Sequence, residues 1–188
     1  MVKSEVLCEE STFLDYPLSN RSEVSLSSLI FVFNELVQYC LTTCTSGVQV
    51  EQRLHDIGLS LGPKVLELVS IKERIYKHET KVVSMLTFIA TTVWKYLFNH
   101  HAELLKSQDH QDEYMISDKR MIISLYVSMG KDRHQPVLAA YVAGMVEGML
   151  CGVYMGAQVS AHVVAQEDGC YVMTLLISLK DEKETNAS

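Results

Sequence analysis

The sequence predicts an α+β domain in which helices cover one face of an antiparallel sheet. Apolar residues recur at helical spacing in four segments of the 188-residue chain. After the third and fourth of these segments, apolar residues alternate with polar ones, as in half-buried strands. Because each element is apolar mainly on one side, a helical layer on a sheet buries those sides. We expect a small α/β plait, an antiparallel four-stranded sheet covered on one face by about four helices.

Composition fits one folded domain and excludes some classes of protein. The chain is 48% hydrophobic and 21% charged, near the globular average. We expect a mobile amino-terminal arm over residues 1–22, a single domain over 23–179 and a loose tail over 180–188. The net charge is −7 and no stripe of Lys and Arg is visible, so nucleic-acid binding is not expected.

Cysteine usage and the first residues indicate a cytosolic protein. The five cysteines are scattered without a Cys-x-x-Cys pair, which fits reduced thiols. Acidic residues stand where a signal peptide would need a basic start and an apolar run. The apolar stretch over residues 137–157 contains Glu147 at its middle, so we interpret it as a buried helix and not as a membrane span.

Spacing defines the first two helices. Ser25 fits an N-cap, the first helix ends near Ser46, and Pro63 is expected to kink the second. The core-facing residues of the first helix are predicted to be Leu26, Leu29, Ile30, Phe33, Val37, Cys40 and Cys44. Those of the second are predicted to be Val50, Leu54, Ile57, Leu61, Val65 and Leu68.

The second half of the chain is predicted to alternate between helices and hairpins. A third helix is expected to bury Val82, Leu86, Ile89, Val93 and Leu97, and residues 99–113 to form a loop or a frayed helix end. Strands are expected over 114–116 and 121–127, joined by a turn at 117–119. Pro136 fits the first turn of a fourth helix, and strands near 159–163 and 171–178 follow, joined by a turn at 168–169.

The first two helices have more apolar surface than one sheet can cover. Large apolar residues lie opposite both predicted core stripes, which indicates a groove shared with another chain. The alternative is that these faces pack on each other or on the third helix. The predicted partner interface comprises Phe31, Val32, Glu35, Gln38, Tyr39, Leu59 and Leu66. A second pattern is a row of small residues for close helix packing, namely Ala140, Gly144, Gly148 and Gly152.

Residue patterns typical of catalysis are missing, so no enzyme activity, cofactor or metal is expected. His100, His101, His110, Asp109 and Asp112 could be drawn as a metal site, but a solvated loop fits them better. Cys40 and Cys44 fit small core residues. Glu147 could be a general acid or base, or a carboxylate that accepts hydrogen bonds at a helix edge or contacts a partner; we favour the second reading.

Ordered segments across residues 22–178 resemble the Bet-three-like subunits of TRAPP, the transport protein particle. They include SEVSLS at 22–27, FNELVQ at 33–38, LHDIG at 54–58, AGMVEG at 143–148 and VSAH at 159–162. No single motif is specific to this family, but the order of the motifs over the whole domain is.

The resemblance implies a non-catalytic scaffold within a cytosolic complex that associates peripherally with the endoplasmic reticulum and cis-Golgi. That complex tethers vesicles and promotes nucleotide exchange on a Rab GTPase, which this chain would serve indirectly. The chain would pair through its first two helices with another Bet-three-like subunit and contact other TRAPP subunits. The family's founding subunit has an acylated cysteine at the start of the third helix, whereas the matching residues 73–79 here contain no cysteine.

A related fold supports a second hypothesis, an apolar small-ligand sensor. The haem-binding version of that fold uses Tyr-x-Ser-x-Arg, and this chain has Gly130 in place of the arginine. The cation that would pair with haem carboxylates is therefore missing, while an uncharged apolar ligand remains compatible with the sequence.

Overall fold

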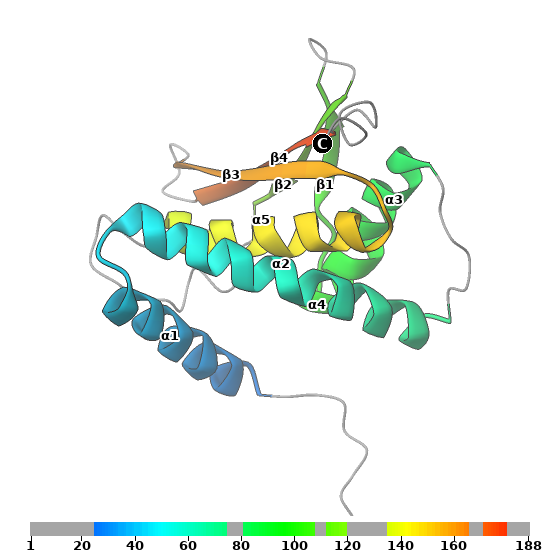
Figure 1. Ribbon diagram of the computed structural model, residues 1–188. Coiled ribbons are helices and arrows are strands. Elements are labelled where there is room, and N and C mark those ends of the chain that lie inside the picture. Colours follow the sequence, from blue (N-terminus) through cyan, green and yellow to red (C-terminus); the bar gives the residue numbers. More distant parts are fainter. Residues whose placement is uncertain (1–24, 75–80, 108–111, 120–134, 166–170, 180–188) are drawn as a thin grey trace, which may run out of the picture.

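Helices cover one face of a four-stranded antiparallel sheet in the computed structural model (Figure 1). The structure describes residues 25–74, 81–107, 112–119, 135–165 and 171–179. The strands are β1 (Glu103–Lys106), β2 (Glu113–Asp118), β3 (Ala157–Ala165) and β4 (Tyr171–Leu179), in the order β1-β2-β4-β3. The predicted fold class is confirmed. The arm predicted at 1–22 and the tail predicted at 180–188 lie outside the described residues.

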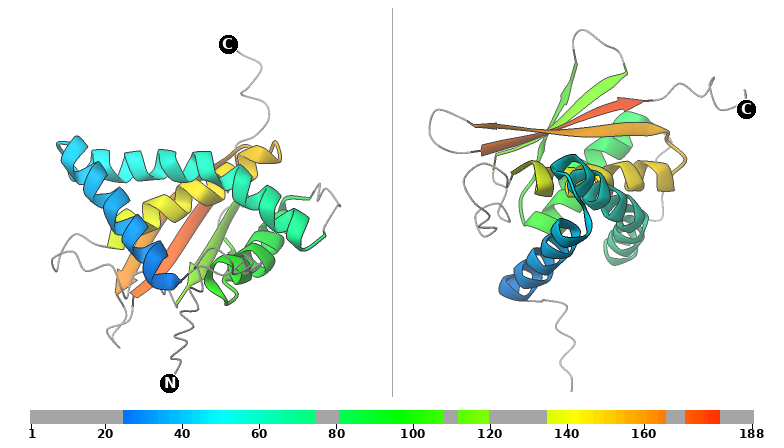
Figure 2. Two further views of the ribbon diagram at one scale, coloured as in Figure 1. Left: turned by 90° about the horizontal axis from the view of Figure 1, so that it is seen from below. Right: turned by 60° about the vertical axis from the view of Figure 1, so that its left-hand side comes forward.

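The helices form layers beneath the sheet. They are α1 (Leu26–Thr43), α2 (Gly47–Lys72), a run of α3 (Val82–Phe88), η2 (Ile89–Val93) and α4 (Trp94–Phe98), and finally α5 (Gln135–Gly152). Figures 1 and 2 show α5 directly under the strands, α2 along it, and α1 on the side of this pair away from the sheet. The central helix is therefore covered on two sides, and its residues from Val142 to Val146 are all buried.

Pro63 does not end α2. The helix continues through it to Lys72 and bends along its length (Figure 2). Proline lacks the N–H that would bond to the carbonyl four residues earlier, which is the usual cause of such a bend. Ser46 caps the start of α2, where its side chain accepts the Gln49 N–H. Ser25 stands at the predicted N-cap of α1, but its side chain makes no capping hydrogen bond.

The third helix contains a π-helical segment that the sequence did not reveal. Over η2 the helix widens, and the Trp94 N–H bonds to the Ile89 carbonyl five residues back. The chain that leaves α4 then returns to this segment, because the Ala102 N–H donates to the Ala90 carbonyl over 2.9 Å. Asn99 adopts the left-handed conformation that ends α4. The widened helix thus helps to direct the chain into β1.

Two predictions about the first strands are wrong. β1 lies within the segment 99–113 that was expected to be a loop, and Ser117 and Asp118 belong to β2 where a turn was expected. β1 escaped detection because it is a short edge strand with charged ends. Asp118 suits a strand interior because buried donors reach its carboxylate. The strand predicted at 121–127 and the turn at 168–169 lie outside the described residues.

Candidate partner-binding surfaces

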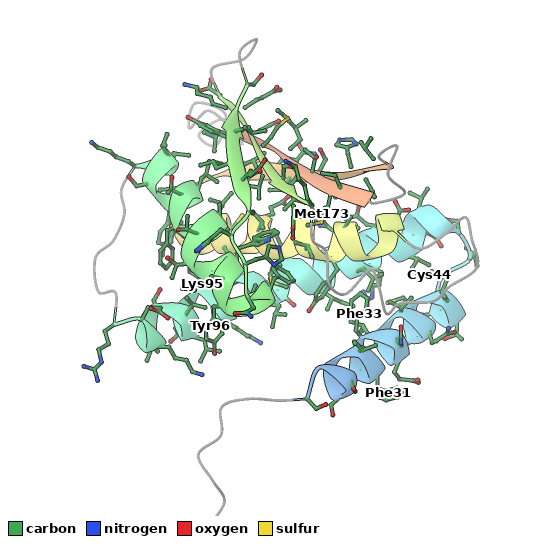
Figure 3. The ribbon with its side chains drawn as sticks, turned by 180° about the vertical axis from the view of Figure 1, so that it is seen from behind. Phe31, Phe33, Cys44, Lys95, Tyr96 and Met173 are labelled. Atoms are coloured by element: carbon green, nitrogen blue, oxygen red, sulfur yellow. The ribbon has the colours of Figure 1, made fainter. Side chains whose placement is uncertain are left out.

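One side of α1 packs on the domain and the other is exposed. Phe33, Val37 and Cys40 are buried, and the Phe33 ring meets the Tyr141 ring edge-on at a centroid distance of 5.5 Å. Figure 3 shows Phe33 between α1 and the rest of the domain, with Phe31 on the side that faces away. This α1 pattern agrees with the predicted core stripe.

The outer side of α1 is apolar over several turns. The side chains of Phe31, Val32 and Tyr39 are 73%, 69% and 56% exposed, and Glu35 and Gln38 between them are exposed too. We call these five residues the α1 face. Monomeric proteins rarely leave such an apolar stripe open to water, because burying one large apolar side chain stabilises a protein by roughly 1.5–3 kcal/mol.

Part of the prediction for the exposed side of α2 is wrong. Leu66 is buried at 9% exposure and Leu59 is half-buried, whereas Leu68, predicted as a core residue, is 46% exposed. The buried stripe of α2 includes Gly58 and Gly62. Because glycine contributes no hydrophobic signal, the stripe was placed on the neighbouring face. The sequence therefore missed Val48, Leu68 and Ile71 as exposed apolar residues of this helix.

The row of small residues on α5 lies against α2. A methyl group built on Gly144 would collide with the His55 carbonyl oxygen, and one on Gly148 with the Leu59 carbonyl oxygen. The added methyl group at Gly152 would lie 3.3 Å from Pro63 Cβ. Pro63 cannot donate to the Leu59 carbonyl, so that oxygen is free of its usual helical partner and sits against the Gly148 Cα. Ala140 instead lines a groove beside β3.

Glu147 joins three elements. Its Oε2 accepts the Val159 N–H of β3 over 2.9 Å and lies 3.5 Å from His55 Nε2 of α2. The side chain is mostly buried, and one strand N–H and one imidazole face it. This geometry fits the hydrogen-bonding role that the sequence favoured for Glu147.

The histidines for which a metal site was weighed and a solvated loop preferred have hydrogen-bonding roles. His100 places Nδ1 2.9 Å from the Phe98 carbonyl and Nε2 2.8 Å from Asp118 Oδ1, while Trp94 Nε1 donates to Asp118 Oδ2. His101 lies 3.1 Å from the Thr91 carbonyl. The described residues contain no group of three or more His, Cys, Asp or Glu side chains that could hold a metal. His110 and Asp109 lie outside them, and Asp112 is exposed.

The cysteine pair on α1 belongs to the helix packing. Cys40 is fully buried and Cys44 is half-buried, and both are free thiols. Burial raises the pKa of the Cys40 thiol, with Cys44 adding to the increase and Arg53 opposing it. No helix among the described residues is long and apolar enough to cross a membrane.

Comparison with known proteins extends over most of the domain. Residues 29–179 match the family model described as transport protein particle (TRAPP) component. Trafficking protein particle complex subunit 5 from Dictyostelium discoideum is 42% identical over 166 residues, which cover 87% of this chain and 89% of that protein. The resemblance to TRAPP subunits that the segments in the sequence indicated is confirmed.

Solved structures confirm the fold. A trafficking protein particle complex subunit 3 from Naegleria fowleri, covalently bound to palmitic acid, aligns with a TM-score of 0.66 at 18% identity, covering 82% of this chain and 94% of that one. A haem protein of the H-NOX family aligns with a TM-score of 0.51 at 13% identity, over 89% of this chain and 78% of that one. At such identities the likeness concerns the fold alone. The family match and the Dictyostelium relative together show that this chain belongs to the TRAPP component family, as a subunit close to subunit 5.

Proposed function

We propose that this chain is a non-catalytic scaffold subunit that joins the TRAPP complex through the α1 face. The partner that fits this face best is another Bet-three-like subunit, which would lay its own helices against Phe31, Val32 and Tyr39. The observation that supports this is the exposure of those side chains on a helix whose other side buries Phe33, Val37 and Cys40. Amphipathic helices commonly bind a partner by placing their apolar face in a hydrophobic groove.

The scaffold supports the activities of the complex without performing chemistry. We infer that it contributes to vesicle tethering and to Rab GTPase nucleotide exchange in transport from the endoplasmic reticulum to the Golgi, with the exchange reaction performed by other subunits. It would work in the cytoplasm and reach the membrane only through the complex. The similarity of the relatives, which are trafficking complex subunits by name, supports this proposal.

The test is co-expression of the full chain with its Bet-three-like partner. We expect Phe31→Asp to weaken the pair by about 2 kcal/mol or more, roughly 30-fold in Kd, because a central aromatic anchor becomes a charge. The isolated variant should stay folded, since the side chain is exposed. Titration calorimetry or size-exclusion chromatography measures the loss of the pair.

The matched control is Tyr154→Asp. Tyr154 is 96% exposed, lies outside the α1 face and has a φ of 62°, a conformation that aspartate tolerates. This variant should bind the partner as the unmodified chain does. Wild-type affinity in both Phe31→Asp and Tyr39→Asp would show that the α1 face is not the interface.

A further inference from the structure

The two edges of the sheet differ in how they resist pairing with another chain. β1 is four residues long, begins with Glu103 and ends with Lys106, and Lys119 Nζ lies 3.2 Å from Glu103 Oε1 at its start. Charges and short length are the usual protection of an edge strand. β3, at the other edge, is nine residues long, and its sequence AQVSAHVVA contains no Lys, Arg, Asp, Glu or Pro. Within the described residues, the β3 edge therefore lacks the protection that β1 has.

The backbone of β3 shows which groups face outward. Val159 pairs with Ile177 of β4, yet its N–H donates to Glu147 Oε2, so it points away from β4. Strand geometry repeats every two residues, so the N–H and C=O groups of Ala161 and Val163 face the same outer edge. Within the described residues no strand lies beside them. The side chains of Gln158, Ser160 and His162 are exposed on the uncovered face of the sheet.

A groove runs under the first half of this edge. Its volume is about 440 Å³, and its walls come from α2, α5 and β3. Two carboxylates, Glu51 and Glu147, line it together with His55, whose Nε2 lies 3.5 Å from Glu147 Oε2. No Lys or Arg is among the described residues that line it. Polar groups such as Gln52, Gln158 and Ser160 complete the rim.

We propose that β3 accepts an extended segment of a partner protein as a fifth strand, and that a basic side chain of this segment enters the groove toward Glu51 and Glu147. The backbone of Ala161 and Val163 would supply the hydrogen bonds, and the acidic groove the selectivity. A second copy of this chain is a poorer occupant, because it would bring another acidic groove and another net charge of −7 to the same junction. The proposal rests on the proposed function only in that the partner belongs to the same assembly.

Amide hydrogen exchange in the assembled complex tests the pairing. We expect the amides of Ala161 and Val163 to exchange at least about ten-fold more slowly in the complex than in the isolated full chain. Val163→Pro removes one outward N–H without breaking a bond to β4, a change that edge strands tolerate. This variant should remain in the complex through the α1 face while the slow exchange at 161 is lost. Unchanged fast exchange at the Ala161 and Val163 amides in the complete complex overturns the proposal.

The preference of the groove for a basic side chain is tested with two peptides. Both are nine residues long and alternate Thr and Val, and they differ only in a central Lys or Glu. The Lys peptide should shift the Ala161 and Val163 amide signals of the full chain and bind at least about ten-fold more tightly than the Glu peptide. Glu51→Lys should reverse this preference, and it keeps the test valid if Val163→Pro fails to fold. Glu67→Gln, an exposed change elsewhere on α2, should not affect it. Equal binding of both peptides contradicts the acidic-groove selectivity.

Two further outcomes separate this proposal from others. Concentration-dependent protection of residues 161–163 in the isolated chain, with a dimer mass that Val163→Pro abolishes, would identify a second copy as the occupant and overturn it. If Phe31→Asp leaves the complex intact while residues 161–163 remain protected, the α1 proposal fails and this one stands. If Phe31→Asp breaks the complex but residues 161–163 are never protected, the α1 proposal stands and this one fails.

Discussion

At the residue scale, glycines set the distance between α2 and α5. Gly58 and Gly62 of α2 face the backbone of α5, and Gly144 and Gly148 of α5 face the carbonyls of His55 and Leu59. The two backbones approach each other so closely that no side chain fits between them. Helices that meet in this way gain dispersion energy and weak Cα–H···O contacts along the crossing. Each of these glycines is therefore a packing residue and not a flexible point.

Gly148→Ala tests this crossing. The added methyl group collides with backbone at the Leu59 carbonyl, which cannot rotate away, so α2 and α5 must separate. We expect a loss of about 1–3 kcal/mol in the free energy of unfolding, measured by urea denaturation. Gly47→Ala is the control, because nothing lies within 4 Å of a methyl group there and alanine favours the helix. Equal stability of both variants would contradict the close crossing.

Cysteine reactivity provides a second test at this scale. In the isolated chain a maleimide should modify the exposed Cys151 at least about ten-fold faster than Cys40, because Cys40 is fully buried and its pKa is raised by burial. Peptide mass spectrometry measures both rates. The raised pKa also means that the Cys40 contribution to stability is complete below the ordinary thiol pKa and is lost as the pH rises through the folded-state value. Comparable rates for the two thiols would show that α1 opens readily.

At the element scale, regular apolar spacing made most of the helices predictable. The stripe of α1 and the strands β3 and β4 were assigned correctly, because large apolar side chains mark the buried side of each. The buried stripe of α2 was not, because two of its members are glycine. The π-helical η2 and the strand position of Asp118 were not visible either, since they depend on partners distant in sequence, such as Ala102, Trp94 and His100.

The corrected stripe of α2 separates two neighbouring leucines. Leu66→Asp places a carboxylate in the core, and we expect it to unfold the domain or to cost about 3 kcal/mol or more. Leu68→Asp, two residues away on the exposed side, should change stability by less than about 0.5–1 kcal/mol. Thermal denaturation followed by circular dichroism compares them. If Leu66→Asp stayed stable while Leu68→Asp unfolded, the buried stripe of α2 would be the one that the sequence indicated.

On the scale of the whole molecule, the domain offers surfaces on two sides of one packed centre. α5 is buried between the sheet and α2. The α1 face and the β3 edge are therefore joined by closely packed helices and strands. The α1 side of this arrangement was predictable from surplus apolar residues, whereas the β3 groove was not. The groove exists only because Glu51, Glu147 and Ser160, distant in sequence, converge in the fold.

Partner binding at the α1 face should stabilise the whole domain by mass action. A partner at about 100 times its Kd adds roughly 2.7 kcal/mol to the free energy of unfolding, since it binds only the folded chain. For a chain of this length we expect the urea midpoint to rise by about 1 M. Pulse proteolysis measures it, with a tag on this chain alone so that its undigested band is told from that of the partner. Phe31→Asp should keep the midpoint of the isolated chain but lose the rise, whereas Tyr154→Asp should keep both. An equal rise in the Phe31→Asp variant would mean that the stabilising contact lies on another surface.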